Sequence, residues 1–483
     1  NVLVEDPKGG ADPHWSKTGR AALTGFIHFI AFKCEKARAN DYFIGRVYEG
    51  KLDDEDKKVL EGYYMEMNDP MAARAIQNLR TGNLNIDNYV PIGTWNLLPE
   101  RWIGRESCIA MILEWITEAQ IKQSQDIKRR LDEGDQMAAM ADPMRDLLEE
   151  AITEARKFGY SQRCIVELSQ LSSMPDKERG SVLSTAFSGI GIFKNSAVVS
   201  RTSFSDINFR DLRGLKNPVT GRWEPISVYL SVNQVDAKAL SVISGTFIDL
   251  MSNYLIANPP NFVNKTDGKM GPFPTLFVLD EFPTMPKLSA IIEGPAVGRG
   301  QKVSYLLIGQ DLGQISGKYG KDDLETVIST TACKVILSQN NENTAQRFSK
   351  MIGNKTVQTT NYSKTEGGLG MAKGTNPFTK NVTYQLQGTS VISTTQLLSL
   401  PMLKQVVLMQ GFIDRPIMAD SPRWYLDKKM KAQAALPPSP NVPDWIVAQR
   451  EDINDDMLAK LGIEYDPNED TEDSEFSDEE LAK

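Results

Sequence analysis

Two adjacent carboxylates, Asp280 and Glu281, follow a short apolar run in the stretch FVLDEFP. Such a run is typical of a buried strand, and in a parallel sheet ligands bind outside the carboxyl ends of the strands. A carboxylate at this position can hold Mg²⁺, and its neighbour can orient and deprotonate an attacking water. The pair therefore predicts a Walker B site of a phosphate-hydrolysing enzyme. The alternative is a strand that ends in two solvated acids before Pro283.

Two further side chains extend this hypothesis. Gln310 ends the next apolar run, VSYLLIGQ, and its amide could hydrogen-bond a γ-phosphate or the attacking water. Arg299, in VGRGQK between the two runs, could neutralise charge on a transferring phosphoryl group of a neighbouring subunit. The alternatives are a simple polar strand end for Gln310, and for Arg299 a cation that interacts with the last carbonyls of a helix.

One part of a nucleotide site is missing from the sequence. The motif G-x-x-x-x-G-K-[ST], whose backbone N–H groups cradle the β-phosphate, occurs nowhere in residues 1–483. Either the chain is not a nucleotide hydrolase, or the phosphate loop lies upstream of Asn1.

Helices must dominate the first part of the chain and strands the second. Within residues 1–200, ESCIAMILEWITEA has helical apolar spacing, and Asp142 before Pro143 is a helix start signal. Later, short apolar runs alternate with helical segments at 236–256 and 342–351. Such alternation predicts an α/β fold with a parallel sheet covered on both faces. The predicted strands lie at 225–232, 275–281, 303–310, 333–339 and 405–411.

The charge is unevenly distributed. The whole chain carries −9, but residues 451–483 hold fourteen Asp and Glu against two Lys, so this tail carries −12 and residues 1–450 carry +3. Nucleic-acid binding by the body is therefore compatible with the composition, whereas the tail should repel DNA. The tail could dock basic protein signals or only aid solubility. Residues 355–390 are polar and predict a long loop or hairpin that is functional or mobile.

The cysteines and histidines exclude several classes of site. Four widely spaced cysteines indicate buried, reduced thiols rather than a disulfide framework or zinc site. The two histidines, His14 and His28, both lie near the start, which argues against a His-based metal site or a Ser-His-Asp triad. No apolar run reaches the ~18 residues that cross a bilayer, and the best candidate, Ala22 to Phe32, reads as a buried helix.

The chain resembles the type IV secretion coupling proteins, the TraG-like ATPases of bacterial conjugation. The resemblance covers roughly residues 1–420 and rests on several separate stretches. These are LVEDPKGGADPHWSKTGRAALTG, ERGSVLSTAFSGIGIF, VSRTSFSDINFRDL, PISVYLSV, FVLDEFPTMPKL, LLIGQDLGQISGKYG, NTAQRFSKMIGNKT and TTQLLSLP.

The resemblance implies a RecA-like, P-loop-type core interrupted by a large all-α domain. The first half of that core, with the Walker A segment and a membrane anchor, would lie upstream of Asn1. The implied domains are an all-α substrate-recognition domain at 1–195, the C-terminal part of the ATPase core at 196–435, and a linker with an acidic tail at 436–483. This fragment alone would then be inactive for lack of Walker A.

The resemblance also implies ATP and Mg²⁺ as cofactors. It places Asp280 on the metal, Asp280 and Gln310 at the nucleotide, Glu281 on the attacking water, and Arg299 at a neighbour's nucleotide. The implied assembly is a homohexamer on the cytoplasmic side of the bacterial inner membrane. Its implied partners are inner-membrane components of the secretion system, relaxase or effector proteins, and single-stranded DNA.

Two other functions stay open at this point. A DNA pump of the FtsK/HerA kind shares the same core, although the long helical region at 1–200 argues against it. A non-catalytic substrate receptor would explain the missing phosphate loop, but it would have no need for acids at 280 and 281.

Overall fold

The computed structural model describes residues 3, 14–205, 207–217, 220–232, 236–260, 272–366 and 378–435. The predicted acidic tail lies outside these described residues. The described residues form two compact units: residues 215–224 and 332–435 make up the second unit, and the others make up the first.

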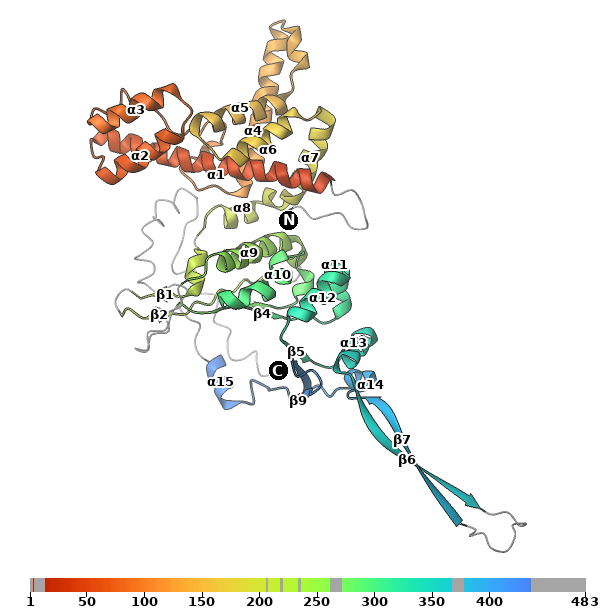
Figure 1. The fold of residues 1–483 in the computed structure, drawn as a ribbon. Helices are drawn as coiled ribbons and strands as arrows, with labels where there is room; N and C mark the ends of the chain where they lie inside the picture. Colours follow the sequence, from red (N-terminus) through yellow and green to blue (C-terminus); the bar gives the residue numbers. More distant parts are fainter. Residues whose placement is uncertain are drawn as a thin grey trace, which may run out of the picture. The chain divides into compact units, whose positions relative to one another are not determined.

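The first unit begins with a helical region, in which α1 runs beside α6 and α7 (Figure 1). Its helices are α1 (His14–Glu49), α2 (Asp54–Glu66), α3 (Pro70–Thr81), α4 (Ile109–Asp132), α5 (Pro143–Phe158), α6 (Gln162–Ser173), α7 (Asp176–Gly189) and α8 (Ser196–Thr202), with short 3₁₀ turns η1 (Glu100–Trp102), η2 (Gln136–Met140) and η3 (Gly191–Lys194). The predicted start of α5 is confirmed, since the Asp142 carboxylate accepts a hydrogen bond from Arg145 N.

Aromatic side chains of α1 fill the centre of this region. Phe26 and Phe29 are fully buried, and the Phe29 ring lies 4.8 Å from that of Trp115 on α4. The segment 22–32 is therefore a core helix, as its length predicted. Two lysines of the same helix are also buried, and each reaches a carboxylate: Lys33 pairs with Glu154 at 2.7 Å, and Lys36 pairs with Glu66 at 2.5 Å.

The rest of the first unit is a small α/β layer. Its elements are η4 (Phe209–Arg213), α9 (Ala237–Ala257), β3 (Thr275–Leu279), η5 (Phe282–Thr284), α10 (Ser289–Val297), η6 (Gly298–Gln301), β4 (Val303–Leu307), α11 (Leu312–Tyr319) and α12 (Lys321–Thr330). Strands β3 and β4 are parallel, with Leu279 opposite Leu307. Phe277 stacks on Tyr305 at 5.3 Å, and both belong to the core that α9 and α10 cover.

The opposite face of this two-stranded sheet is exposed. Leu276 and Val278 of β3, together with Leu306 and Ile308 in and after β4, all lie open to solvent. Parallel sheets are normally covered on both faces, so this apolar face lacks a layer in the chain as described.

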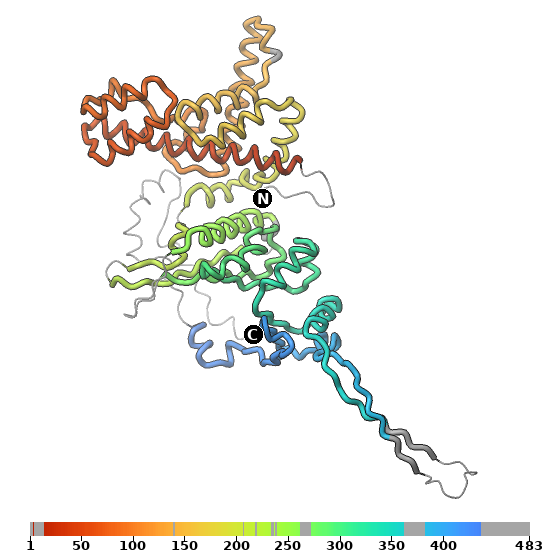
Figure 2. Tube along the Cα trace, in the orientation of Figure 1, coloured from red at the N-terminus to blue at the C-terminus, as the bar shows by residue number. Residues whose placement is uncertain are grey.

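The second unit contains a three-stranded antiparallel sheet and a long hairpin. Its elements are β1 (Leu215–Lys216), β2 (Trp223–Glu224), β5 (Cys333–Ile336), α13 (Glu342–Ile352), β6 (Asn354–Glu366), β7 (Phe378–Ser390), α14 (Thr394–Leu398), β8 (Lys404–Met409), β9 (Ile417–Asp420) and α15 (Lys428–Ala434). The sheet order is β5-β8-β9, and β6 pairs only with β7. Figure 2 shows the two hairpin strands running side by side.

The predicted parallel sheet is confirmed only in part. Among the described strands, β3 and β4 pair in parallel, whereas the predicted strands at 333–339 and 405–411 form β5 and β8, which pair in the antiparallel sense. Residues 225–232 form no strand, and Val228 and Tyr229 in this stretch are exposed. A short apolar run indicates a buried strand, but it does not specify the partner or the direction of pairing.

Two smaller expectations also change. Cys34 and Cys164 are buried free thiols as predicted, but Cys333 is exposed. The segment Ala239–Ala257 of α9 is long and apolar enough to cross a membrane by length and composition. Ile248 and Leu255 of this segment are buried in the core around β3 and β4, although only 22% of the segment is buried.

Candidate functional site

The candidate site lies where β3 and β4 end. The parallel pairing continues past both strands, because Ile308 N donates to Leu279 O at 3.0 Å and Phe282 N donates to Ile308 O at 3.1 Å. These two bonds hold the loop after β3 against the loop after β4. Polar side chains in the two loops are thereby brought to one edge of the sheet.

Asp280 is exposed at this edge. Its Oδ1 accepts a hydrogen bond from Glu281 N at 3.1 Å, which fixes the carboxylate beside its own backbone. Within the described ranges, no group of three His, Cys, Asp or Glu side chains could hold a metal. Mg²⁺ is usually bound by one or two carboxylates together with substrate phosphates and water. Asp280 therefore fits the single carboxylate of a nucleotide-dependent Mg²⁺ site.

Glu281 contacts the glutamine of the neighbouring loop. Its Oε1 accepts a hydrogen bond from Gln310 Nε2 at 2.7 Å, although the two residues are 29 positions apart. The Glu281 backbone is in the left-handed region, with φ at 50° and ψ at 36°. For a residue with a side chain this costs roughly 1–2 kcal/mol. Glu281 O also accepts from Thr284 N at 2.9 Å, which closes the turn after the strand.

Packing beneath these two loops keeps them close. Phe282 and Pro283 are buried, and the Phe282 ring lies 5.9 Å from that of Tyr319 on α11. A Cβ on Gly309 would lie only 3.1 Å from Pro283 Cγ. Sequence reasoning did not identify this support, although the Pro after one strand and the Gly after the next were available as signals.

Arg299 is not part of this cluster. It is exposed in η6, before the amino end of β4, whereas Gln310 follows the carboxyl end of the same strand. In this chain the structure therefore brings Glu281 and Gln310 together beside Asp280, and it leaves Arg299 at the other end of the strand.

The chemistry available to this cluster is incomplete in one way. It offers a carboxylate for a hard cation, a second carboxylate that can accept a proton, and an amide that can orient a water or phosphate oxygen. The sequence contains no phosphate-cradling loop to complete it. The residues present thus fit the metal and water side of an ATP site, but not its β-phosphate side.

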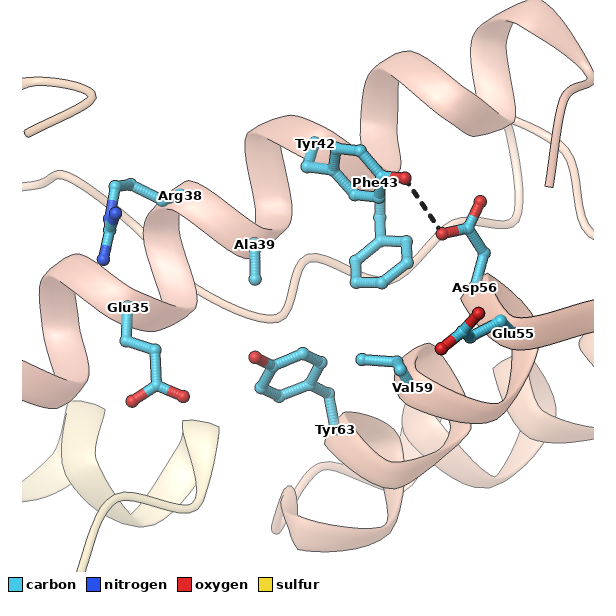
Figure 3. Close-up of a pocket in the computed structure, with 9 residues that line it drawn as sticks. All are labelled: Glu35, Arg38, Ala39, Tyr42, Phe43, Glu55, Asp56, Val59 and Tyr63. Atoms are coloured by element: carbon cyan, nitrogen blue, oxygen red, sulfur yellow. Dashed lines mark hydrogen bonds between the residues drawn. The ribbon is translucent and has the colours of Figure 1, made fainter. Parts of the chain in front are cut away.

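A separate cavity of about 430 Å³ lies between α1 and α2 (Figure 3). Tyr42 Oη donates to Asp56 Oδ1 at 3.0 Å, and Arg46 Nε donates to Asp56 Oδ2 at 2.9 Å. Burial acts to raise the pKa of Asp56, but these two hydrogen bonds hold it below its ordinary value. None of the predicted site residues lies in this cavity.

The comparisons with known proteins agree on one family. The model of the family described as type IV secretory system conjugative DNA transfer matches residues 107–441. The conjugal transfer protein TraG of Escherichia coli is 26% identical over 334 residues, which are 64% of this chain and 49% of the relative. The VirD4 protein of Rhizobium rhizogenes is 25% identical over 243 residues, which are 50% of this chain and 32% of the relative.

Solved structures of another protein are also similar in part. The bacterial conjugative coupling protein TrwBdeltaN70 aligns with a TM-score of 0.41 and 14% identity, over 76% of this chain and 68% of that one. TrwB in complex with ADP and Mg²⁺ aligns with a TM-score of 0.39 and 13% identity, over the same shares of the two chains. The chain spans about half the length of the TraG relative, or less in the case of VirD4.

Proposed function

The chain belongs to the family of conjugative DNA-transfer proteins of type IV secretory systems, and we propose that it is part of an ATP-driven coupling protein. This protein would recruit relaxase-bound single-stranded DNA, effector proteins or both, and move them to the secretion channel. The observation that carries the proposal is the contact between Glu281 and Gln310, 2.7 Å apart at the carboxyl ends of two parallel strands and next to Asp280.

Each of the three side chains has a distinct role. Asp280 would hold Mg²⁺, which would neutralise charge on the phosphates. Glu281 orients the attacking water and accepts its proton. Gln310 shares its amide between Glu281 and the γ-phosphate, so loss of that phosphate alters the loop after β4. A strained backbone at Glu281 supports this assignment, because such strain gathers at functional sites.

The exposed apolar face of β3 and β4 supports a larger core in the full protein. Leu276, Val278, Leu306 and Ile308 would be covered by a further layer, which we assign to an upstream half of a RecA-like domain that carries the phosphate loop. Hydrolysis then belongs to the longer protein rather than to residues 1–483 alone.

Arg299 is proposed to act on the nucleotide of a neighbouring subunit. Its place before β4, away from Asp280 and Gln310, fits such a role better than a role in its own site. The proposal implies a ring of subunits, in our view a homohexamer, held at the cytoplasmic side of the inner membrane beside the secretion machinery.

The test is ATP hydrolysis by the longer protein, with its upstream residues present, in the presence and absence of single-stranded DNA. Glu281→Gln should lower hydrolysis by at least about 100-fold, since general-base catalysis contributes about that much or more. Nucleotide binding should persist, because the variant changes no group on the phosphates. Glu118→Gln, which makes the same change at an exposed site on α4, should leave hydrolysis unaltered.

Three results would redirect the proposal. If Glu281→Gln hydrolyses ATP as fast as the parent protein, the two acids are only a solvated strand end. A parent protein that binds cargo without any hydrolysis would instead be a non-catalytic receptor. Stronger stimulation by double-stranded than by single-stranded DNA would favour a pump of the FtsK/HerA kind.

A further inference from the structure

The hairpin β6–β7 is a two-stranded ribbon with both outer edges bare. The two strands are paired over thirteen positions, from Asn354 opposite Ser390 to Glu366 opposite Phe378. Within the described part of the chain, neither strand pairs with any other. An isolated two-stranded hairpin is only marginally stable in water, and bare edges are templates for pairing with another chain.

One face of this ribbon carries an exposed apolar row. Alternate residues of β7 lie on the same face, and Val382, Tyr384 and Leu386 are 40%, 66% and 74% exposed. Across the ribbon, Thr360 lies opposite Tyr384 and Gln358 lies opposite Leu386, so strand β6 does not cover the row.

Between its flanking lysines, Lys355, Lys364 and Lys380, the ribbon lacks charged side chains that would protect its edges. Residues 356–361 and 382–390 contain no Asp, Glu, Lys or Arg. Charged side chains are the commonest means by which edge strands avoid pairing with another chain. A phosphate backbone would in turn require basic side chains along this part of the ribbon, which it does not offer.

The apolar row is symmetric about its central residue. Val382, Thr383, Tyr384, Gln385 and Leu386 read apolar, polar, aromatic, polar, apolar in either direction. If two copies of β7 pair antiparallel about Tyr384, Tyr384 meets its own copy and Val382 meets Leu386 of the other chain. Such a contact is isologous and pairs like with like on both faces.

We propose that β7 is a self-association edge, at which the hairpins of two copies of this chain join into a four-stranded antiparallel sheet centred on Tyr384. The contact is independent of ATP hydrolysis. If the subunits form rings, a twofold contact of this kind would join chains of two different rings.

Disulfide trapping tests the register of this contact. The full chain carries Cys333→Ser, which removes the exposed native thiol. Tyr384→Cys should then form cross-linked dimers under mild oxidation, because directly opposite Cβ atoms lie within disulfide reach. Thr360→Cys, at the residue of β6 directly opposite Tyr384, is the matched control on the same face. Its two copies would lie about 14 Å apart, three strand spacings, so its yield should be at least about tenfold lower.

Sedimentation of the full chain provides a second readout. The chain should show a concentration-dependent dimer, and Tyr384→Lys, which places like charges opposite each other, should shift it to monomer. Equal cross-linking of both cysteine variants, a chain that is monomeric at all concentrations, or a dimer that Tyr384→Lys leaves intact would each overturn the proposal. If the chain is instead monomeric and Tyr384→Lys lowers its affinity for a single-stranded oligonucleotide, the ribbon binds nucleic acid rather than a second copy of the chain.

Discussion

Glu281 combines a strained backbone with a side-chain contact at the proposed site. Its backbone is left-handed at φ 50°, a conformation that glycine or asparagine adopts more readily. The conformation turns the chain immediately after Asp280 and brings the Glu281 carboxylate within 2.7 Å of Gln310.

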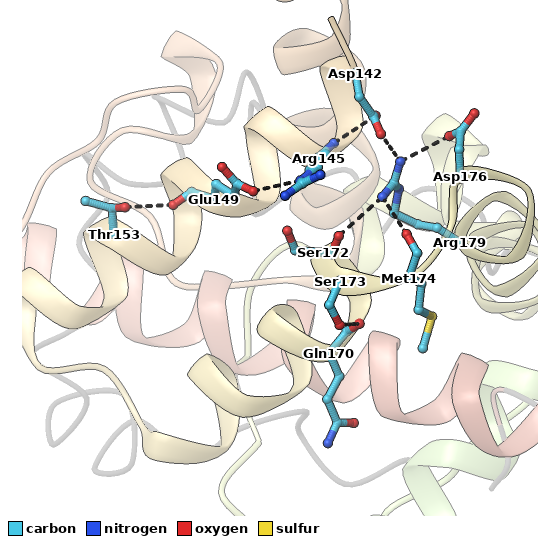
Figure 4. A network of polar contacts seen from close by, with 10 residues as sticks. All are labelled: Asp142, Arg145, Glu149, Thr153, Gln170, Ser172, Ser173, Met174, Asp176 and Arg179. Carbon is cyan, nitrogen blue, oxygen red and sulfur yellow. Dashed lines mark hydrogen bonds and ion pairs between the residues drawn. The ribbon is translucent and has the colours of Figure 1, made fainter.

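Arg179 is one of the buried charged residues of the helical region. Its buried guanidinium contacts the carboxylates of Asp142 and Asp176, and it donates to Met174 O at 3.1 Å (Figure 4). Arg179→Leu should therefore lower the free energy of unfolding by roughly 1–3 kcal/mol, because it removes the hydrogen bonds that a buried guanidinium donates to Ser172 O and Met174 O and its ion pair with Asp142. Urea denaturation of the full chain measures this.

A neighbouring arginine provides the control for that experiment. Arg145 pairs with Glu149 at 2.8 Å, but both side chains are more than half exposed. Arg145→Leu should cost less than about 1 kcal/mol, as is usual for surface ion pairs. If both variants lower the free energy of unfolding equally, Arg179 stabilises the chain no more than a surface ion pair does.

At the scale of elements, two glycines should respond in opposite directions to the same substitution. Gly159 ends α5 at φ 68°, and a Cβ there would meet Glu66 O at 2.1 Å. Gly62 lies inside α2, with open space around a Cβ. Gly159→Ala should lower the melting temperature of the chain, because the added methyl clashes with backbone and the conformation is strained.

Gly62→Ala should instead stabilise the chain by roughly 0.5–1 kcal/mol, the difference in helix propensity between the two residues. Differential scanning calorimetry of both variants compares them directly. A Gly159→Ala variant as stable as the parent would show that α5 and the end of α2 can separate without cost.

At the scale of the whole molecule, buried thiols should make the free energy of unfolding fall as the pH rises in the alkaline range. Burial raises the pKa of Cys34 and of Cys164 from 9.0 to about 12. Above pH 9 the unfolded chain loses these two protons while the folded chain keeps them. The stability due to the protonated thiols is therefore fully present below pH 9 and falls as pH rises towards 12.

The expected loss is roughly 1 kcal/mol for each thiol by about pH 10. Urea unfolding at about pH 8 and about pH 10 measures it, and Cys34→Ala should remove about half of the difference due to these thiols. If the change in the free energy of unfolding between the two pH values is the same in Cys34→Ala as in the parent chain, this thiol does not titrate differently in the folded and unfolded chains.

The sequence by itself determined features that depend on local pattern. The helix starting at Pro143, the core helix around Phe26 and the apolar strands at 275–279 and 303–307 follow from apolar spacing, caps and turn residues close in the chain. The carboxylates after one strand and the glutamine after the next were also found in this way, because strand ends can be read from local sequence.

Only the tertiary structure decided how distant segments pair. It gave β5 an antiparallel partner in β8, left residues 225–232 outside any strand, and placed Arg299 away from Gln310. It also set the contact between Glu281 and Gln310 and the left-handed turn that makes it. These features depend on contacts between residues far apart in the chain, and an apolar run carries no information about which other run it will meet.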